Sequence, residues 1–98
     1  MMRVIARRTL VDFWTVHAAA EQPLKAWFAF VRRARWDGPA AVKADYRNAS
    51  FLAGNRVCFN IAGNKFRLIV KINYPRQTIF IRFIGTHAEY DRIDALSI

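Results

Sequence analysis

Residues 56–74 read RVCFNIAGNKFRLIVKINY, two alternating runs joined by the turn signal Ala62-Gly63-Asn64. Successive side chains of a strand point to opposite faces of a sheet, so the pattern predicts a hairpin with one apolar and one polar face. The apolar, core-facing side chains are Val57, Phe59, Ile61, Phe66, Leu68, Val70, Ile72 and Tyr74. The opposite face carries Arg56, Cys58, Asn60, Arg67, Ile69, Lys71 and Asn73.

A third run, TIFIRFI at residues 78–84, repeats the alternation. It places Ile79, Ile81 and Phe83 inward and Thr78, Phe80, Arg82 and Ile84 outward. The three strands together then present Asn60, Arg67, Lys71 and Arg82 on one open sheet face. A single cation on a sheet is usually a solvated side chain. Three cations and an amide on adjacent strands indicate a phosphate-binding surface.

The next segment, THAEYD at residues 86–91, has the pattern of a helix start. Thr86 and Glu89 match a capping box, which makes His87 the first helical residue and places Tyr90 on the same side of the helix. A helix start attracts anions. A His, a Tyr and several cations around an anion supply proton transfer and charge stabilisation for phosphodiester cleavage. The structural alternative is that Thr86 only caps, Tyr90 packs on the sheet and His87 is a solvated surface residue.

The first half of the chain is predicted to be mainly helical. A short strand at residues 3–5 precedes two helices, the first capped by Thr9 and the second carrying Pro23 in its first turn. Residues 40–46 are predicted to form a short helix and residues 47–55 a loop. The apolar side chains at helical spacing are interpreted as core rather than as a stacking surface: Leu10, Phe13, Trp14, Leu24, Trp27, Phe28 and Val31. His17, at the same spacing, is interpreted as a helix-surface or packing residue.

Length and composition bound the interpretation. Ninety-eight residues predict one domain over residues 1–98. The net charge of +9 favours polyanionic partners but does not choose between DNA, ribosomal RNA and an acidic protein. The single cysteine, Cys58, excludes an internal disulfide and is interpreted as a small filler residue, and no Cys/His cluster indicates a metal site. No apolar stretch approaches the roughly 20 residues of a membrane span, and a signal peptide is not evident, so a cytoplasmic location is expected.

Residues 55–70 and 81–91 resemble the HigB-type toxins of the RelE-like bacterial toxin–antitoxin superfamily. The resemblance implies an α+β, RelE-like fold, with N-terminal helices packed on one face of a mainly antiparallel twisted sheet and a short C-terminal helix. It also implies a type II toxin that acts as a ribosome-dependent mRNA interferase and inhibits translation, without metal or cofactor. The implied partners are mRNA, the ribosome and a cognate antitoxin of the HigA-like, helix-turn-helix type.

The resemblance extends to individual residues. It implies that His87 transfers a proton to or from the 2'-hydroxyl or the leaving 5'-oxygen, and that Arg67 and Arg82 bind the phosphate and stabilise its added charge. Tyr90 is expected to orient the phosphate or to stack on a base. The implied RNA-binding residues are Asn60, Lys65, Lys71 and Asp91.

Two functions from other classes stay open on the sequence. One is a non-catalytic RNA- or ribosome-binding module, and the other is a protein-interaction domain whose basic face serves an acidic partner. Only His87 and Tyr90 favour catalysis over these two, because pure phosphate binding requires neither side chain.

Overall fold

Across residues 1–95 and 97–98, the part of the chain that the computed structural model describes, five strands form one sheet in the order β1-β5-β4-β3-β2. β1 (Arg3–Ile5) is an edge strand that pairs in parallel with β5 (Thr78–Thr86). The remaining neighbours, β2 (Ser50–Leu52), β3 (Arg56–Ile61), β4 (Phe66–Asn73) and β5, pair antiparallel. The predicted α+β class with a mainly antiparallel sheet is confirmed.

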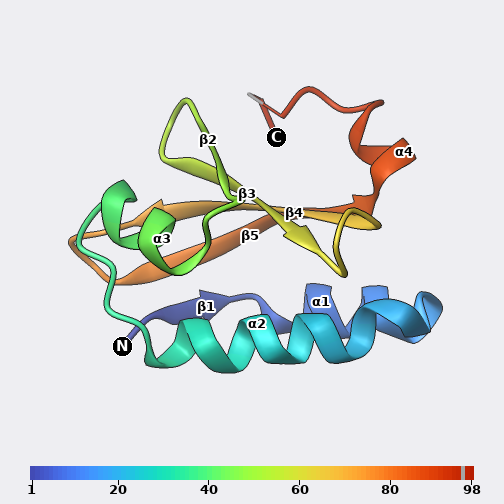
Figure 1. The fold of residues 1–98 in the computed structure, drawn as a ribbon, viewed down its shortest axis with the longest axis horizontal. Coiled ribbons are helices and arrows are strands. Elements are labelled where there is room, and N and C mark those ends of the chain that lie inside the picture. Colours follow the sequence, from blue (N-terminus) through green and yellow to red (C-terminus); the bar gives the residue numbers. More distant parts are fainter. Residues whose placement is uncertain (96) are drawn as a thin grey trace.

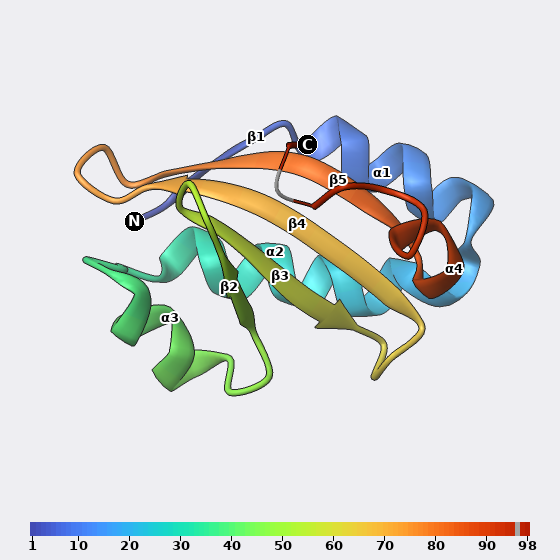
Figure 2. The same cartoon turned by 90° about the horizontal axis from the view of Figure 1, so that it is seen from above.

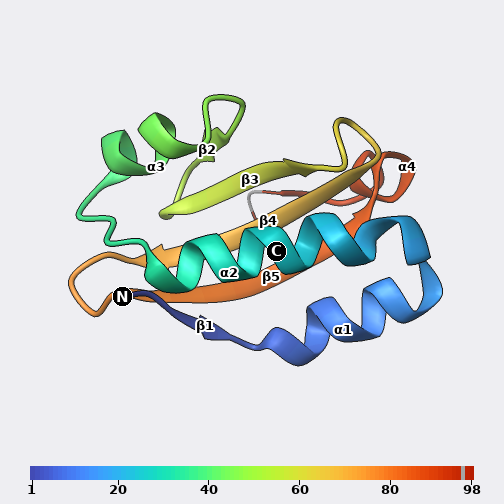
Figure 3. The same ribbon diagram turned by 60° about the horizontal axis from the view of Figure 1, so that its bottom comes forward.

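Two helices cover one face of this sheet (Figures 1 and 3). They are α1 (Arg7–Val16) and α2 (Glu21–Arg33), joined by the short 3-10 helix η1 (Ala18–Ala20). Their buried side chains confirm the apolar stripes predicted from the sequence: Leu10, Trp14, Leu24, Trp27 and Val31. The prediction that Thr9 caps the first helix is wrong, because α1 begins two residues earlier and no side chain caps it.

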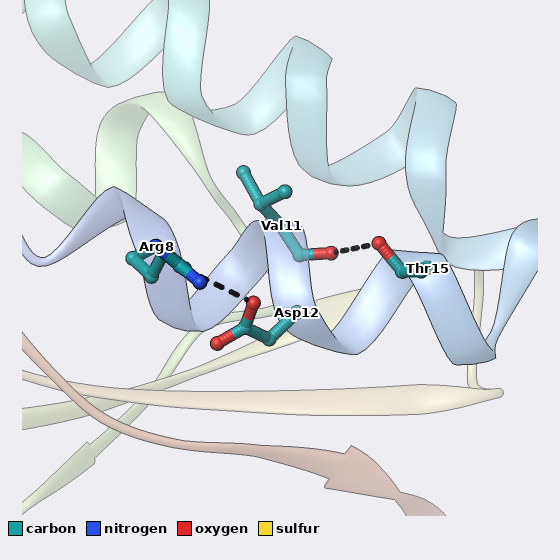
Figure 4. A network of polar contacts seen from close by, with 4 residues as sticks. All are labelled: Arg8, Val11, Asp12 and Thr15. Atoms are coloured by element: carbon teal, nitrogen blue, oxygen red, sulfur yellow. Dashed lines mark hydrogen bonds and ion pairs between the residues drawn. The ribbon is translucent and has the colours of Figure 1, made fainter.

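Polar side chains of α1 bond along the helix (Figure 4). Arg8 Nε lies 3.3 Å from Asp12 Oδ1, and the Thr15 hydroxyl donates to the Val11 carbonyl at 2.8 Å. Such exposed pairs contribute only a few tenths of a kcal/mol, on the order of 0.3–0.5 for an i,i+4 ion pair. The helices are therefore held mainly by the side chains that they bury against the sheet.

The connection from α2 to the sheet is anchored by an aromatic cluster. This connection includes α3 (Pro39–Asp45), which lies beside the β2–β3 edge of the sheet (Figure 2). Trp36 is buried, stacks on Phe59 with ring centroids 6.2 Å apart and donates its indole N–H to Asp45 at 2.9 Å. Tyr46 meets Phe59 edge-on at 5.1 Å. Burial of each large apolar side chain is worth about 1.5–3 kcal/mol, so this cluster fixes the otherwise irregular connection.

The prediction of a loop over residues 47–55 is wrong in its middle, where β2 forms a short edge strand. Ser50 and Phe51 are exposed, so the segment lacks the regular apolar alternation that identifies a half-buried strand. Its pairing with β3 follows from the tight turn between them, in which Gly54 and Asn55 both have positive φ angles.

A β-bulge reverses two of the predicted side-chain orientations in β5. Val70 pairs with Ile81, but Ile69 pairs with Phe83, which leaves Arg82 as the extra residue of the bulged strand. An extra residue shifts every following side chain to the other face. Phe83 therefore does not face the helices as predicted, and Ile84, predicted to point outward, packs against the helix-side core.

The chain ends on the face of the sheet opposite α1 and α2. There α4 (His87–Tyr90) begins with the predicted capping box: Thr86 Oγ1 accepts from the Glu89 amide at 3.2 Å, and Glu89 Oε1 accepts from the Thr86 amide at 2.8 Å. After α4 the chain turns back over this face (Figures 1 and 2), and Arg56 Nε donates to the Ile98 carbonyl at 2.9 Å. The face predicted to be open is thus partly covered, and its Cys58 and Ile69 side chains are buried. No helix in the described residues is long and apolar enough to cross a membrane.

Candidate phosphate-binding site

Arg67 lies near the start of β4, where two other elements hold its guanidinium group. Its Nη2 donates to Asn64 Oδ1 in the β3–β4 turn at 3.2 Å, and its Cζ lies 5.1 Å from the centre of the Tyr90 ring on α4. Its Nε is buried and has no hydrogen-bond partner in the described part of the chain. A guanidinium fixed in this way loses little side-chain freedom when it binds an anion, and its fork of N–H groups suits phosphate.

Cys58 lies next to this pair. It is 1% exposed, and burial raises the pKa of its thiol, while the neighbouring Arg67 and Tyr90 side chains act to lower it. The raised pKa keeps the thiol neutral near pH 7. The sequence interpretation of Cys58 as a filler residue missed this contact. The available signal was the strand register, because Cys58 and Arg67 are diagonal neighbours on the same face of β3 and β4.

Tyr90 closes the site from the side of α4. Burial raises the pKa of its hydroxyl, the nearby Cys58 raises it further, and the Arg67 charge acts in the opposite direction. The hydroxyl therefore stays protonated near neutral pH and is able to donate a hydrogen bond to an anion. Its ring is half-buried, so one part packs against the guanidinium of Arg67 while another part stays accessible.

His87 begins α4 beside the same turn. Its backbone N–H donates to the Lys65 carbonyl at 3.2 Å, which ties the helix start to the β3–β4 turn. Its Nδ1 lies 3.3 Å from Asp91 Oδ2, one helical turn further on, and its side chain is 45% exposed. When Nδ1 carries a proton it donates to Asp91, which leaves Nε2 available to exchange a proton with a ligand. Asp91, predicted to bind RNA, lies where its carboxylate orients the imidazole.

The predicted site residues fall into two groups. The first lies around α4 and the β3–β4 turn and comprises Lys65, Arg67, His87, Tyr90 and Asp91. The second, Lys71 and Arg82, lines a hollow of about 460 Å³ together with residues of the β4–β5 turn. The Arg67 guanidinium bonds to Asn64 in the β3–β4 turn, whereas the Arg82 side chain, from the middle of β5, lines a hollow that reaches the β4–β5 turn.

Asn60 belongs to neither group by any direct contact. It pairs in register with Arg67 across β3 and β4, and its side chain is exposed. It also lines shallow depressions at the β3 edge beside Tyr46. Its position next to Arg67 is compatible with contact to a bound strand of RNA.

Two further observations bear on the chemistry. The described residues contain no group of three or more His, Cys, Asp or Glu side chains that could hold a metal ion. His17, interpreted as a helix-surface or packing residue, stacks on Phe13 with ring centroids 4.3 Å apart and meets Phe66 edge-on at 5.8 Å. The α4 site thus offers the imidazole of His87 and the hydroxyl of Tyr90 for proton transfer, and Tyr90 lies against the guanidinium of Arg67.

Comparison with known proteins supplies a family. The model of the HigB toxin family, described as the RelE-like toxic component of a toxin-antitoxin system, matches residues 20–93. The chain is 26% identical over 98 aligned positions to the mRNA interferase toxin HigB of Escherichia coli (strain K12), in an alignment that covers 97% of this chain and 93% of that protein. The mRNA interferase HigB of Escherichia coli O157:H7 and that of Shigella flexneri align with the same identity and coverage.

Proposed function

Because the chain belongs to the HigB family of RelE-like toxins, the toxic component of a toxin-antitoxin system, we propose that it is an mRNA interferase that cleaves messenger RNA on the ribosome. The names of its relatives support cleavage of mRNA. Membership of the family implies an antitoxin partner, and we propose that it is HigA-like with a helix-turn-helix. We further propose that residues 1–98 act as one domain in the cytoplasm, where translating ribosomes are found.

The observation that carries the proposal is the fixed guanidinium of Arg67 beside a helix that contributes both His87 and Tyr90. In the proposed reaction the 2'-oxygen of the RNA attacks the adjacent phosphorus, and the bond from phosphorus to the 5'-oxygen breaks. The products are a 2',3'-cyclic phosphate and a free 5'-hydroxyl. The 2'-hydroxyl loses one proton and the 5'-oxygen gains one, so the balance requires an acid and a base but no metal ion.

We assign the steps to the residues at the α4 site. His87 exchanges a proton through Nε2, with Asp91 orienting the ring, and either the 2'-hydroxyl or the 5'-oxygen is its partner. Arg67 donates to the non-bridging oxygens and stabilises the charge that grows on them in the transition state. Tyr90, with its hydroxyl protonated, orients the phosphate or contacts a base.

The remaining predicted residues are assigned to RNA binding. Lys65 is exposed on the β3–β4 turn and Asn60 lies across the strand pair from Arg67, so both lie along a path for the RNA backbone. Arg82 was predicted to hold the same phosphate as Arg67. Its side chain lines the hollow that reaches the β4–β5 turn, which supports a contact with another part of the RNA.

The proposal is tested by inducing expression of the wild type and of His87→Ala, while 5' ends are mapped on a reporter mRNA and on a matched reporter that lacks a start codon. Growth arrest is expected with the wild type, together with new ends on the translated reporter only, and both should vanish in His87→Ala. His17→Gln serves as the control for loss of the chain's other histidine, whose ring packs against Phe13 and Phe66. New ends on both reporters would contradict ribosome dependence, and arrest without new ends would favour a ribosome-binding module without catalysis.

A further inference from the structure

The hollow at the β4–β5 end of the sheet is distinct from the α4 site. Six of the residues that line it bear on its chemistry: Asn55, Lys71, Asn73, Tyr74, Phe80 and Arg82. Its volume of about 460 Å³ lies in the range of small-molecule sites, roughly 300–1,000 Å³, and is large enough for a nucleobase. No acidic side chain lines it.

The two cations of the hollow are not neutralised. Elsewhere Arg8, Lys25 and Arg35 each lie within 4.0 Å of a carboxylate. Neither Lys71 nor Arg82 forms an ion pair or a side-chain hydrogen bond within the described residues, and both are exposed. Two unpaired cations beside one hollow favour a phosphate-bearing ligand.

An aromatic ring lies directly beside these cations. Phe80 pairs in register with Lys71 across β4 and β5. The side chains before and after it face the helices, so Phe80 points to the opposite face, where it is 36% exposed. The hollow also offers an amide whose orientation is set: Asn73 Oδ1 accepts from the Arg76 backbone N–H at 3.1 Å, so its Nδ2 is the free donor. Exposed rings that alternate with cations bind single-stranded nucleic acid by stacking on bases while the cations hold the backbone.

The hollow and Arg67 lie at different positions along β4. Arg67 and Lys71 are four residues apart on one strand, about 13 Å at roughly 3.3 Å per residue. An apolar row of Cys58, Ile69 and Phe83 crosses the sheet between them. The Arg67 guanidinium bonds to Asn64, before the start of β4 and so on the side away from Lys71, and a ligand that contacts Arg67 and also fills the hollow therefore extends over more than one nucleotide.

We propose that this hollow is a second nucleotide subsite, in which the ring of Phe80 stacks on a base while Lys71 and Arg82 hold the adjacent phosphate of single-stranded RNA. The inference rests on the proposed function, because the strand that enters the hollow is the one whose scissile phosphate lies at Arg67. The subsite binds the RNA at a distance from the reacting bond. Its loss should weaken binding more than it slows the chemical step.

The test is the affinity of the purified chain for 2'-O-methyl oligoribonucleotides, which cannot be cleaved, from dinucleotide to hexanucleotide, measured by fluorescence anisotropy. Affinity is expected to rise on the order of tenfold at the length that first reaches the hollow. Phe80→Ala and the pair Lys71→Gln with Arg82→Gln should remove that step, and Phe80→Trp should retain it. Phe51→Ala is the matched control, because Phe51 is another exposed aromatic side chain. It lies on β2, pairs with Val57 and does not line the hollow.

The outcomes separate the subsite from the activity. A step that persists in Phe80→Ala, or affinity that rises smoothly with length in the wild type, would overturn the subsite even if the chain cleaves mRNA. A step that disappears in Phe80→Ala but not in Phe51→Ala would support the subsite, and it would do so even if expression of the chain produced no new mRNA ends. Folding of each variant is checked by its urea unfolding midpoint.

Discussion

Replacement of Arg67 by lysine separates the charge of this side chain from its geometry. Lysine keeps the positive charge, but it lacks the fork of N–H groups that lets Arg67 bond to Asn64 at 3.2 Å while lying 5.1 Å from the Tyr90 ring. The proposed function requires a guanidinium held in place before the phosphate gains charge. We therefore expect Arg67→Lys to bind ribosomes nearly as well as the wild type and to cleave mRNA more slowly.

The magnitude follows from the bonds that lysine cannot replace. A hydrogen bond to a charged group is worth about 1.5–3 kcal/mol, so loss of one that tightens in the transition state slows cleavage roughly 10- to 150-fold. Loss of the Asn64 bond and of the ring contact also lowers the free energy of unfolding by about 1–2 kcal/mol, which leaves a domain of this size folded.

The assay is single-turnover cleavage of a reporter mRNA on purified ribosomes at saturating toxin, with the concentration dependence measured in parallel. Arg82→Lys is the matched control, because Arg82 is exposed and has no ion pair or side-chain hydrogen bond in the described residues. Its maximal rate should stay within about threefold of the wild type, because Arg82 is assigned to RNA binding and saturation compensates for weaker binding. Equal losses in the two variants, or a loss in half-saturation alone for Arg67→Lys, would refute the assignment of Arg67 to the chemical step.

Two further substitutions and one labelling experiment test the structure around the site. Thr86→Ala removes the side-chain cap of α4, which should destabilise this helix by about 0.5–2 kcal/mol and lower the cleavage rate. Thr86→Ser should retain the stability of the helix and the rate. An unchanged rate in Thr86→Ala would show that α4 does not depend on its cap. Gly85→Ala places a Cβ 2.5 Å from the Phe83 ring and should lower the free energy of unfolding by about 1–3 kcal/mol. The control Gly38→Ala, where nothing lies within 4 Å of the new Cβ, should lower it by about 0.5 kcal/mol or less. Equal urea unfolding midpoints for the two variants would contradict this packing. Burial raises the pKa of the Cys58 thiol, so iodoacetamide should label the folded chain slowly at pH 7 and faster only as the pH rises above the ordinary thiol range. Rapid labelling of the folded chain at pH 7 would contradict the burial of this thiol.

The hairpin and the helix-side core could be predicted from the sequence because alternation and helical spacing report local geometry directly. Val57, Phe59, Leu68 and Val70 face the helices as their period requires. Alternation fails where a strand gains a residue. Nothing in the run through Arg82 signals the bulge, since it depends on how β5 pairs with β4 rather than on β5 itself.

The candidate site likewise combines a local feature that the sequence predicts with tertiary contacts that it does not predict. The capping box at Thr86 is a local pattern, so the start of α4 at His87 could be predicted to the residue. The contact of Cys58 with Arg67 and Tyr90 depends on where α4 folds back against the sheet, which no short-range pattern encodes. The separation of Arg82 from Arg67 likewise depends on tertiary structure, because Arg67 bonds to the β3–β4 turn and Arg82 is the extra residue of the bulge in β5.

The form of the RNA ends tests the account most directly. Purified chain is added to ribosomes programmed with a short mRNA, and the 3' ends of the upstream product are examined with and without a 2',3'-cyclic phosphodiesterase, using the wild type, His87→Ala and Arg67→Lys. The account predicts cleavage only on the ribosome, a 2',3'-cyclic phosphate from the wild type, and loss or slowing in both variants. A 3'-hydroxyl paired with a 5'-phosphate, or full activity in His87→Ala, would contradict attack by the 2'-oxygen at a site formed by Arg67, His87 and Tyr90.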